Sequence, residues 1–148
     1  GAVVTKSAEL IDPEAVLELN RPYPWVSRGG LKLDHALKVF GVKAEGRVCM
    51  DVGASTGGFT DVLLAHGAKR VFAVDGGRDQ LHPRLALDSR VVRLEGVDAR
   101  DLTTLEISEA PDLVVCDASF IGLDKILPRP LSLAAPAAGL IAHVKTKN

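Results

Sequence analysis

Short apolar runs separated by stretches of helical character dominate the chain from residue 47 onward. The apolar runs cover residues 47–53, 71–75, 91–95, 112–117 and 140–145. Continuous runs of this length are typical of strands that are buried on both faces. Strands that alternate with helices predict an α/β fold with a doubly wound, mostly parallel sheet and helices on both of its faces.

An amphipathic helix is expected ahead of the first strand, beginning near Gly30. Its apolar side chains recur with the i, i+3, i+4, i+7 spacing of one helix face, at Leu33, Ala36, Leu37 and Phe40. Ser27 is the candidate N-cap, and Gly41 is the expected C-terminal stop.

Two prolines within three residues stiffen the segment Arg21-Pro-Tyr-Pro-Trp25 and predict an extended connector. We therefore interpret residues 21–29 as a linker and residues 30–148 as the main domain, with its sheet truncated at the C-terminal edge. Residues 1–20 read as short extended pieces around a turn. We interpret them as the remnant of an upstream domain.

Composition limits the partners and the compartment. A chain of 148 residues, 47% of them apolar, can bury the core of one domain, and its net charge of −1 does not by itself indicate a nucleic-acid partner. Residues 20–47 nevertheless hold six basic and two acidic residues, which suits either phosphate contacts or a solvated helix face. Two cysteines in apolar runs, with no signal peptide or spanning segment in the sequence, predict a cytoplasmic protein.

A glycine-rich turn follows the first predicted strand, in the sequence Asp51-Val-Gly-Ala-Ser-Thr-Gly-Gly-Phe59. Small residues there let the backbone turn sharply and let a ligand approach it. Asp75 ends the next predicted strand, where an acid can accept hydrogen bonds from ribose hydroxyls. The pattern predicts a site for a nucleoside-containing cofactor, and the alternative is a tight turn without a ligand.

The spacing of the turn narrows the choice of cofactor. A dinucleotide fingerprint has glycine at the middle position, where this chain has Ser55, and the turn lacks the lysine of a phosphate-binding P-loop. Gly-x-Ser-x-Gly-Gly resembles the first motif of S-adenosylmethionine-dependent methyltransferases. An NAD-dependent oxidoreductase is therefore disfavoured.

Three further residues follow or close predicted strands. Asp98 follows the third strand and is either an adenine ligand or a turn-forming residue. Asp117 closes the fourth strand and either faces the same crevice as the glycine-rich turn or caps a helix. Lys145 closes the fifth strand, where a pair with Asp117 would suit proton transfer; otherwise it merely ends the strand.

Four segments in this order resemble one family: residues 25–33, residues 51–61, Cys116–Leu123, and Val144-Lys145. The chain is similar to TlyA-type proteins, which are named either hemolysins or FtsJ-like ribosomal-RNA methyltransferases. The resemblance implies a Rossmann-like, S-adenosylmethionine-dependent enzyme that methylates a ribose 2′-hydroxyl of ribosomal RNA. It also implies an upstream S4-type RNA-binding domain.

The resemblance assigns roles to residues. The first three members of the family's Lys-Asp-Lys-Glu catalytic set fall on Lys32, Asp117 and Lys145. Expected cofactor-binding residues are Gly53, Ala54, Ser55, Gly57, Gly58, Phe59, Asp75, Asp98 and Asp117. Expected RNA contacts are Arg21, Arg28, Lys32 and Lys38. No metal and no membrane partner is expected.

General chemistry agrees with this catalytic set. A ribose hydroxyl must lose its proton as it attacks the methyl group, and lysine is a useful base only when its pKa falls from ~10.4 towards ~7–8. A second nearby lysine and burial both lower the pKa of a lysine. We expect Lys145 to be the base, with Asp117 and Lys32 positioning it and the substrate.

Two departures from the family are visible. Thr-Lys-Asn follows Lys145 where the family has Pro-Gln-Phe-Glu, so the catalytic glutamate is not in this sequence, and residues 76–80 differ from the family's usual Val-Gly-Tyr-Gly-Gln. A non-catalytic RNA-binding module that keeps the fold is one alternative. A membrane-active hemolysin is another, although no long basic amphipathic helix is visible in the sequence.

Overall fold

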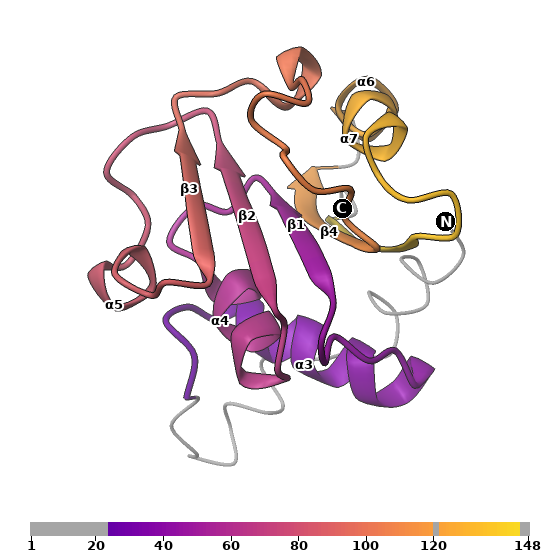
Figure 1. Ribbon diagram of the computed structural model, residues 1–148. Coiled ribbons are helices and arrows are strands. Elements are labelled where there is room, and N and C mark those ends of the chain that lie inside the picture. The colour runs from indigo at the N-terminus through magenta and orange to yellow at the C-terminus, as the bar shows by residue number, and fades with distance from the viewer. Residues whose placement is uncertain (1–23, 120–121, 146–148) are drawn as a thin grey trace.

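The computed structural model describes residues 24–119 and 122–145, in which five strands form one parallel sheet (Figure 1). The strands are β1 (Val48–Val52), β2 (Arg70–Asp75), β3 (Val91–Glu95), β4 (Leu113–Ser119) and β5 (Gly139–Lys145). Their order is β3-β2-β1-β4-β5, and all neighbours are parallel. The predicted doubly wound parallel sheet is confirmed. Within the described residues, β5 forms one of its edges.

Helices cover both faces of the sheet. The helices α3 (Gly29–Phe40), α4 (Gly58–Ala65) and α5 (Pro83–Ala86) lie on one face. The short helices η1 (Ala99–Asp101), α6 (Leu123–Ile126) and α7 (Pro128–Ser132) lie on the other. Figure 1 shows α3 and α4 on the opposite side of the strands from α6 and α7.

The side chains of β1 show how the core divides. Cys49 packs in the cluster under α3 and α4, while Met50 and Val52 pack in the cluster on the other face. Successive side chains of a strand point to opposite faces, so a strand covered on both sides must be apolar at nearly every position. Asp51 is the exception in β1, and it lies on the face of α3 and α4.

Helix α3 ends as predicted, because Gly41 adopts a left-handed φ of 65° and donates to the last turn. The prediction that Ser27 caps the helix is wrong: the N-cap is Arg28, and no side chain caps this end. Ser27 instead packs against the start of α4. A Cβ on Gly58 would collide with the Ser27 Oγ, so only glycine allows this close approach.

The sequence pattern also predicts a helix over residues 80–87 and one over 123–134 that is interrupted near Pro128 and Pro130. Of the stretch 80–87, only Pro83–Ala86 is α-helical, with His82 as its N-cap. The stretch 123–134 forms two short helices, and the predicted interruption is confirmed, with Pro128 at the first position of α7. Proline fits the first turn of a helix but cannot donate within one, which divides this segment.

Two findings concern only residues 24–119 and 122–145. Among them, no helix has the length and apolar character needed to cross a membrane. No group of three or more His, Cys, Asp or Glu side chains in the same residues is arranged to hold a metal ion. The predicted upstream remnant 1–20 and Arg21 lie outside the described residues.

Candidate active site

A cleft of about 910 Å³ lies at the carboxyl ends of β1 and β4, where the strand order reverses. The residues before and at the start of α3 line one wall, including Arg28 and Lys32. The loop that begins at Gly53 lines a second wall, and Asp51 and Asp117 complete the lining. Ligands of parallel α/β sheets bind at this topological position.

A second hollow of about 400 Å³ adjoins the cleft on the side of β2 and β3. Asp75 and Gly76 line it after β2, and residues 96–99 line it after β3. Gly53 lines both the cleft and the hollow, so a ligand longer than either one can pass over the loop that starts there.

The backbone of the glycine-rich loop is satisfied by the protein itself. The N–H groups of Gly53 and Ala54 both donate to the carbonyl of Val74, at 2.8 and 2.9 Å, and Ser55 N–H donates to Asp75 Oδ1 at 3.0 Å. Gly57 N–H donates to the carbonyl of Ala54. A phosphate-binding loop aims such N–H groups at its ligand, so this loop suits a cofactor without phosphates.

The predicted loop residues divide between lining the cleft and shaping the loop. The lining residues are Gly53, Ala54, Ser55, Gly58 and Phe59. Gly57 has a φ of 103°, and a Cβ there would collide with Leu85 of α5. Glycine at this position therefore lets the loop turn beneath α5.

Asp75 joins the loop to the end of β2. Its Oδ1 accepts from Ser55 N–H, and its Oδ2 accepts from Gly77 N–H at 2.8 Å. A carboxylate oxygen has two lone pairs, so each oxygen can still accept a bond from a ligand in the hollow.

Asp98 lines the hollow and also caps a turn. Its carboxylate accepts from the backbone N–H and the guanidinium of Arg100, the closest contact being 2.6 Å. Hydrogen bonds from the Arg100 side chain, then from its backbone, lower the pKa of Asp98 to about 2. The turn-forming alternative is thus present in the structure, together with a place on the wall of the hollow.

Asp117 and Lys32 line the same cleft, although 85 residues of sequence separate them. Asp117 lies in β4, and a Cβ on Gly29 would be 3.4 Å from its Oδ2, so this oxygen faces the first turn of α3. The backbone of Lys145 lies in β5 and pairs in register with Ser119. The side chain of Lys145 lies outside what the structure describes.

Comparison with known proteins agrees with this architecture. Residues 25–147 match the model of the FtsJ-like methyltransferase family. The chain belongs to this family. Family membership implies S-adenosylmethionine as the methyl donor.

Relatives of this FtsJ-like chain carry two kinds of name. Hemolysin A of Brachyspira hyodysenteriae is 44% identical over 86% of this chain and 54% of its own length. The 16S/23S rRNA (cytidine-2′-O)-methyltransferase TlyA of Mycobacterium tuberculosis is 50% identical over 82% of this chain and 45% of its own length. The chain thus spans about half the length of these curated relatives, and the predicted resemblance to TlyA-type proteins is confirmed.

Solved structures agree with the FtsJ-like fold. A structure from Streptococcus thermophilus that carries the hemolysin name aligns with a TM-score of 0.78 and 42% identity, over 82% of this chain and 45% of the other. A ribosomal protein L11 methylase from Lactobacillus delbrueckii aligns with a TM-score of 0.61 at 16% identity, over 78% of this chain and 60% of the other, and shows the shared fold.

Asp51 lies in this FtsJ-like site, and the sequence pattern gave it no role. Its carboxylate is buried and accepts from Thr60 Oγ1 at 2.8 Å. Burial raises the pKa of Asp51 to about 7, and the negative charges of Asp117 and Asp75 add to the rise. The only signal in the sequence was an acid inside an otherwise apolar strand.

His143 is a second residue without a predicted role. It pairs in register with Asp117 across β4 and β5, and its Nδ1 lies 3.0 Å from Asp117 Oδ1. A single histidine in an apolar run gave no indication of this contact.

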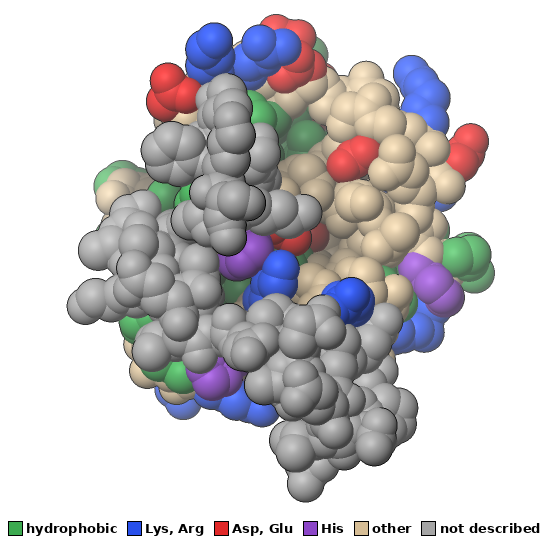
Figure 2. Space-filling model, turned by 180° about the vertical axis from the view of Figure 1, so that it is seen from behind, with side chains coloured by type: hydrophobic (Ala, Val, Ile, Leu, Met, Phe, Trp, Pro, Cys, Tyr) green, Lys and Arg blue, Asp and Glu red, His purple; other side chains and the backbone are tan. Residues whose placement is uncertain are grey.

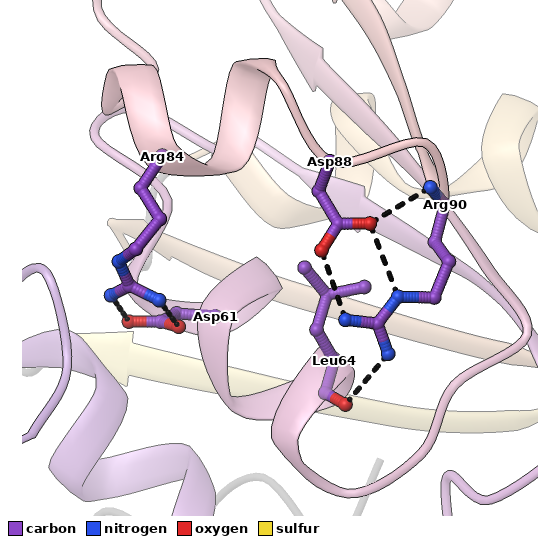
Figure 3. A network of polar contacts seen from close by, with 5 residues as sticks. All are labelled: Asp61, Leu64, Arg84, Asp88 and Arg90. Carbon is purple, nitrogen blue, oxygen red and sulfur yellow. Dashed lines mark hydrogen bonds and ion pairs between the residues drawn. The ribbon is translucent and has the colours of Figure 1, made fainter.

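Another carboxylate, that of Asp61 in α4, holds the segment that leads into α3 and the cleft wall. Figure 3 shows Arg84 making two parallel hydrogen bonds to Asp61, at 3.1 and 2.9 Å. The N–H of Val26 also donates to Asp61, at 2.9 Å. Beside this pair, Asp88 binds Arg90, which in turn donates to the carbonyl of Leu64 at 3.2 Å.

The predicted RNA contacts do not share one place. Arg28 and Lys32 line the cleft, whereas Lys38 pairs with Asp34 at 2.9 Å on an exposed part of α3. Figure 2 shows Lys or Arg, His, and Asp or Glu side chains close together near the middle of one face of the described part of the chain.

Proposed function

We propose that this chain is the methyl-transfer part of an enzyme that methylates a ribose 2′-hydroxyl of ribosomal RNA with S-adenosylmethionine. The observation that carries the proposal is the convergence of Lys32 and Asp117 on one cleft beside the glycine-rich loop. An amine and a carboxylate at the switch point of a parallel sheet suit proton transfer at a bound substrate. The activity named for the Mycobacterium tuberculosis relative supports the choice of substrate.

We assign different parts of the cofactor to the larger cleft and to the smaller hollow. We assign the larger cleft to the positively charged methionine part, because Asp51 and Asp117 place two acidic groups in its lining. We assign the smaller hollow to adenosine, with Asp75 accepting from the ribose and Asp98 from the adenine amino group. The predicted loop residues form the wall between them. When bound, the cofactor supplies a methyl group activated by the neighbouring positive sulfur.

The residues of the chain then have to activate the ribose hydroxyl. Lys145 is the proposed base, because it ends β5 beside the carboxyl end of β4. Asp117 orients the amines, and Lys32 holds the substrate on the opposite wall. Fixing the hydroxyl in line with the methyl group supplies a large share of the rate.

The RNA backbone is proposed to lie across the entrance of the cleft. Arg28 and Lys32 carry positive charge to this wall, whereas Lys38 is proposed as a separate contact from the exposed part of α3. Arg21, which lies outside the described residues, is proposed as a further contact to the RNA.

Methyl transfer to ribosomal RNA tests the proposal. The full-length protein is incubated with labelled S-adenosylmethionine and with ribosomal subunits from cells that lack its gene, and the modified nucleotide is located by mass spectrometry. Wild type is expected to add a ribose methyl group, and Lys32→Ala to slow transfer by about 10²-fold or more. Lys43→Ala, an exposed lysine outside the cleft, is the control and should act as wild type. An RNA that is bound but never methylated would favour the non-catalytic module.

A further inference from the structure

The contact between His143 and Asp117 is built by the register of two strands. Asp117 of β4 pairs directly with His143 of β5. Val115 and Ile141, two residues earlier on each strand, pack in the cluster under α3 and α4, so Asp117 and His143 lie on that same face. The contact therefore lies on the side of the sheet where α3 brings Lys32 to the cleft.

The chemistry of the contact fixes its direction. An ionised carboxylate can only accept hydrogen bonds, so Nδ1 of His143 carries the proton that is donated to Asp117 Oδ1 over 3.0 Å. His143 is 9% exposed, so the imidazole is largely desolvated, whereas the Asp117 side chain is 25% exposed on the wall of the cleft. With Oδ1 held by the imidazole, Oδ2 is turned toward Gly29 at the start of α3.

Packing alone does not account for a histidine at this position. Ile141, on the same face of β5, is 3% exposed and fills its place with an apolar side chain. A buried imidazole has to be hydrogen-bonded to offset its desolvation, whereas an apolar residue carries no such requirement. The side chain is therefore best explained by what it does to Asp117.

We propose that His143 is a positioning residue that holds the Asp117 carboxylate in the orientation needed for methyl transfer. This inference rests on the proposed function, since Asp117 is assigned there to orient the catalytic amines. His143 touches neither the cofactor nor the RNA in this proposal. Its effect passes through the carboxylate of Asp117.

Two substitutions that differ in where they place an amide separate positioning from mere filling of space. In His143→Asn the amide nitrogen lies close to the place of Nδ1 and can still donate to Asp117. In His143→Gln the amide nitrogen lies further out, near the place of Nε2. His66→Leu is the matched control, because it removes another histidine–aspartate contact, 2.7 Å to Asp34, which lies outside the cleft.

The full-length variants are compared by kcat and KM for ribosomal RNA and by calorimetric titration with S-adenosylmethionine. We expect His143→Asn to keep kcat within about threefold of wild type and His143→Gln to lower kcat by about tenfold or more. We expect KM and cofactor affinity to change less than threefold in both, and His66→Leu to leave kcat unchanged.

Equal kcat values for His143→Asn and His143→Gln would overturn the inference, whether both match wild type or both are slow. A loss confined to KM or to cofactor affinity would also overturn it. If wild type itself transfers no methyl group, the proposed function fails and the inference falls with it. An active wild type with indistinguishable variants removes the inference alone.

Discussion

The acidic residues that line the larger cleft and the smaller hollow lie in opposite environments. Asp51, on the wall of the larger cleft, is buried, with the Thr60 hydroxyl as a hydrogen-bond donor, and burial raises its pKa to about 7. Asp98, on the wall of the smaller hollow, has a side chain that is 40% exposed, and hydrogen bonds from Arg100 lower its pKa to about 2. At the cleft, burial therefore destabilises the ionised form of Asp51, and a bound cation would stabilise it. The smaller hollow offers an acceptor that is ionised at all physiological pH values.

Removing the charge of Asp117 is expected to have the largest effect. Asp117→Asn keeps the size of the side chain but removes the negative charge that orients the amines, so kcat should fall by about 10³-fold. The measurement is single-turnover methyl transfer to ribosomal RNA, with circular dichroism as a check that the fold is kept. A fall of less than about fivefold would contradict the role of Asp117.

The burial of Asp51 should make the free energy of unfolding depend on pH. Its pKa is about 7 in the folded state against an ordinary value of 3.8, so the folded state holds an extra proton between these pH values. The free energy of unfolding then falls as pH rises from about 4 to 7, by up to about 3 kcal/mol. Asp51→Asn removes this slope, which urea unfolding at pH 5 and pH 8 measures. Parallel slopes in both proteins would show that Asp51 titrates normally.

The same acid predicts a pH dependence of cofactor binding. A positively charged ligand favours the ionised form of Asp51, so affinity for S-adenosylmethionine should increase as pH rises from 6 to 8. The increase should be about tenfold at most, and Asp51→Asn should bind with nearly constant affinity. Calorimetric titration across this range tests the expectation.

The two aspartate–arginine pairs of Figure 3 extend the comparison to stability. Asp61 is 6% exposed and accepts from Val26 and Arg84, whereas Asp88, which accepts from Arg90, is 24% exposed. Asp61→Ala should destabilise the fold by about 1–3 kcal/mol, because Val26 and Arg84 lose their acceptor. Asp88→Ala should cost below about 1 kcal/mol. Equal losses in thermal unfolding would mean that burial does not distinguish the pairs.

The smallest effect is expected at Asp98. Its carboxylate already accepts from Arg100, so Asp98→Asn should weaken S-adenosylmethionine binding by only about threefold to tenfold. Sinefungin, which keeps the adenosine part, should lose affinity to the same extent. A variant that binds both as tightly as wild type would remove the adenine contact assigned to Asp98.

Local patterns in the sequence predict the strands of this molecule and the end of α3 well. Apolar runs predict the strands because a sheet covered on both faces admits few polar residues, and Gly41 predicts a helix end through its backbone freedom. The cap at Ser27 fails because a contact with Gly58, 31 residues away, determines where that side chain lies. The helix predicted over residues 80–87 is shorter in the structure for a similar reason, since turn and sheet contacts compete with weak helical periodicity.

The site is predicted in part for the same reason. Ends of parallel strands meet at one edge, so Gly53, Asp75 and Asp117 are expected together from order alone. The sequence of one strand does not determine its register with a neighbouring strand, so the pairing of His143 with Asp117 is visible only in the structure. Burial of Asp51 likewise depends on Thr60 and on helices that pack over it.

The contacts of Val26 and Ser27 determine where a shortened recombinant form of this protein should begin. Val26 is tied to α4 through Asp61, and Ser27 rests directly on the backbone of Gly58. A recombinant fragment that starts at residue 30 would keep the strands β1 to β5 yet expose the first turn of α4 to solvent. Such a fragment should purify as a folded protein with a damaged ligand-binding surface, and a boundary upstream of Trp25 avoids that loss.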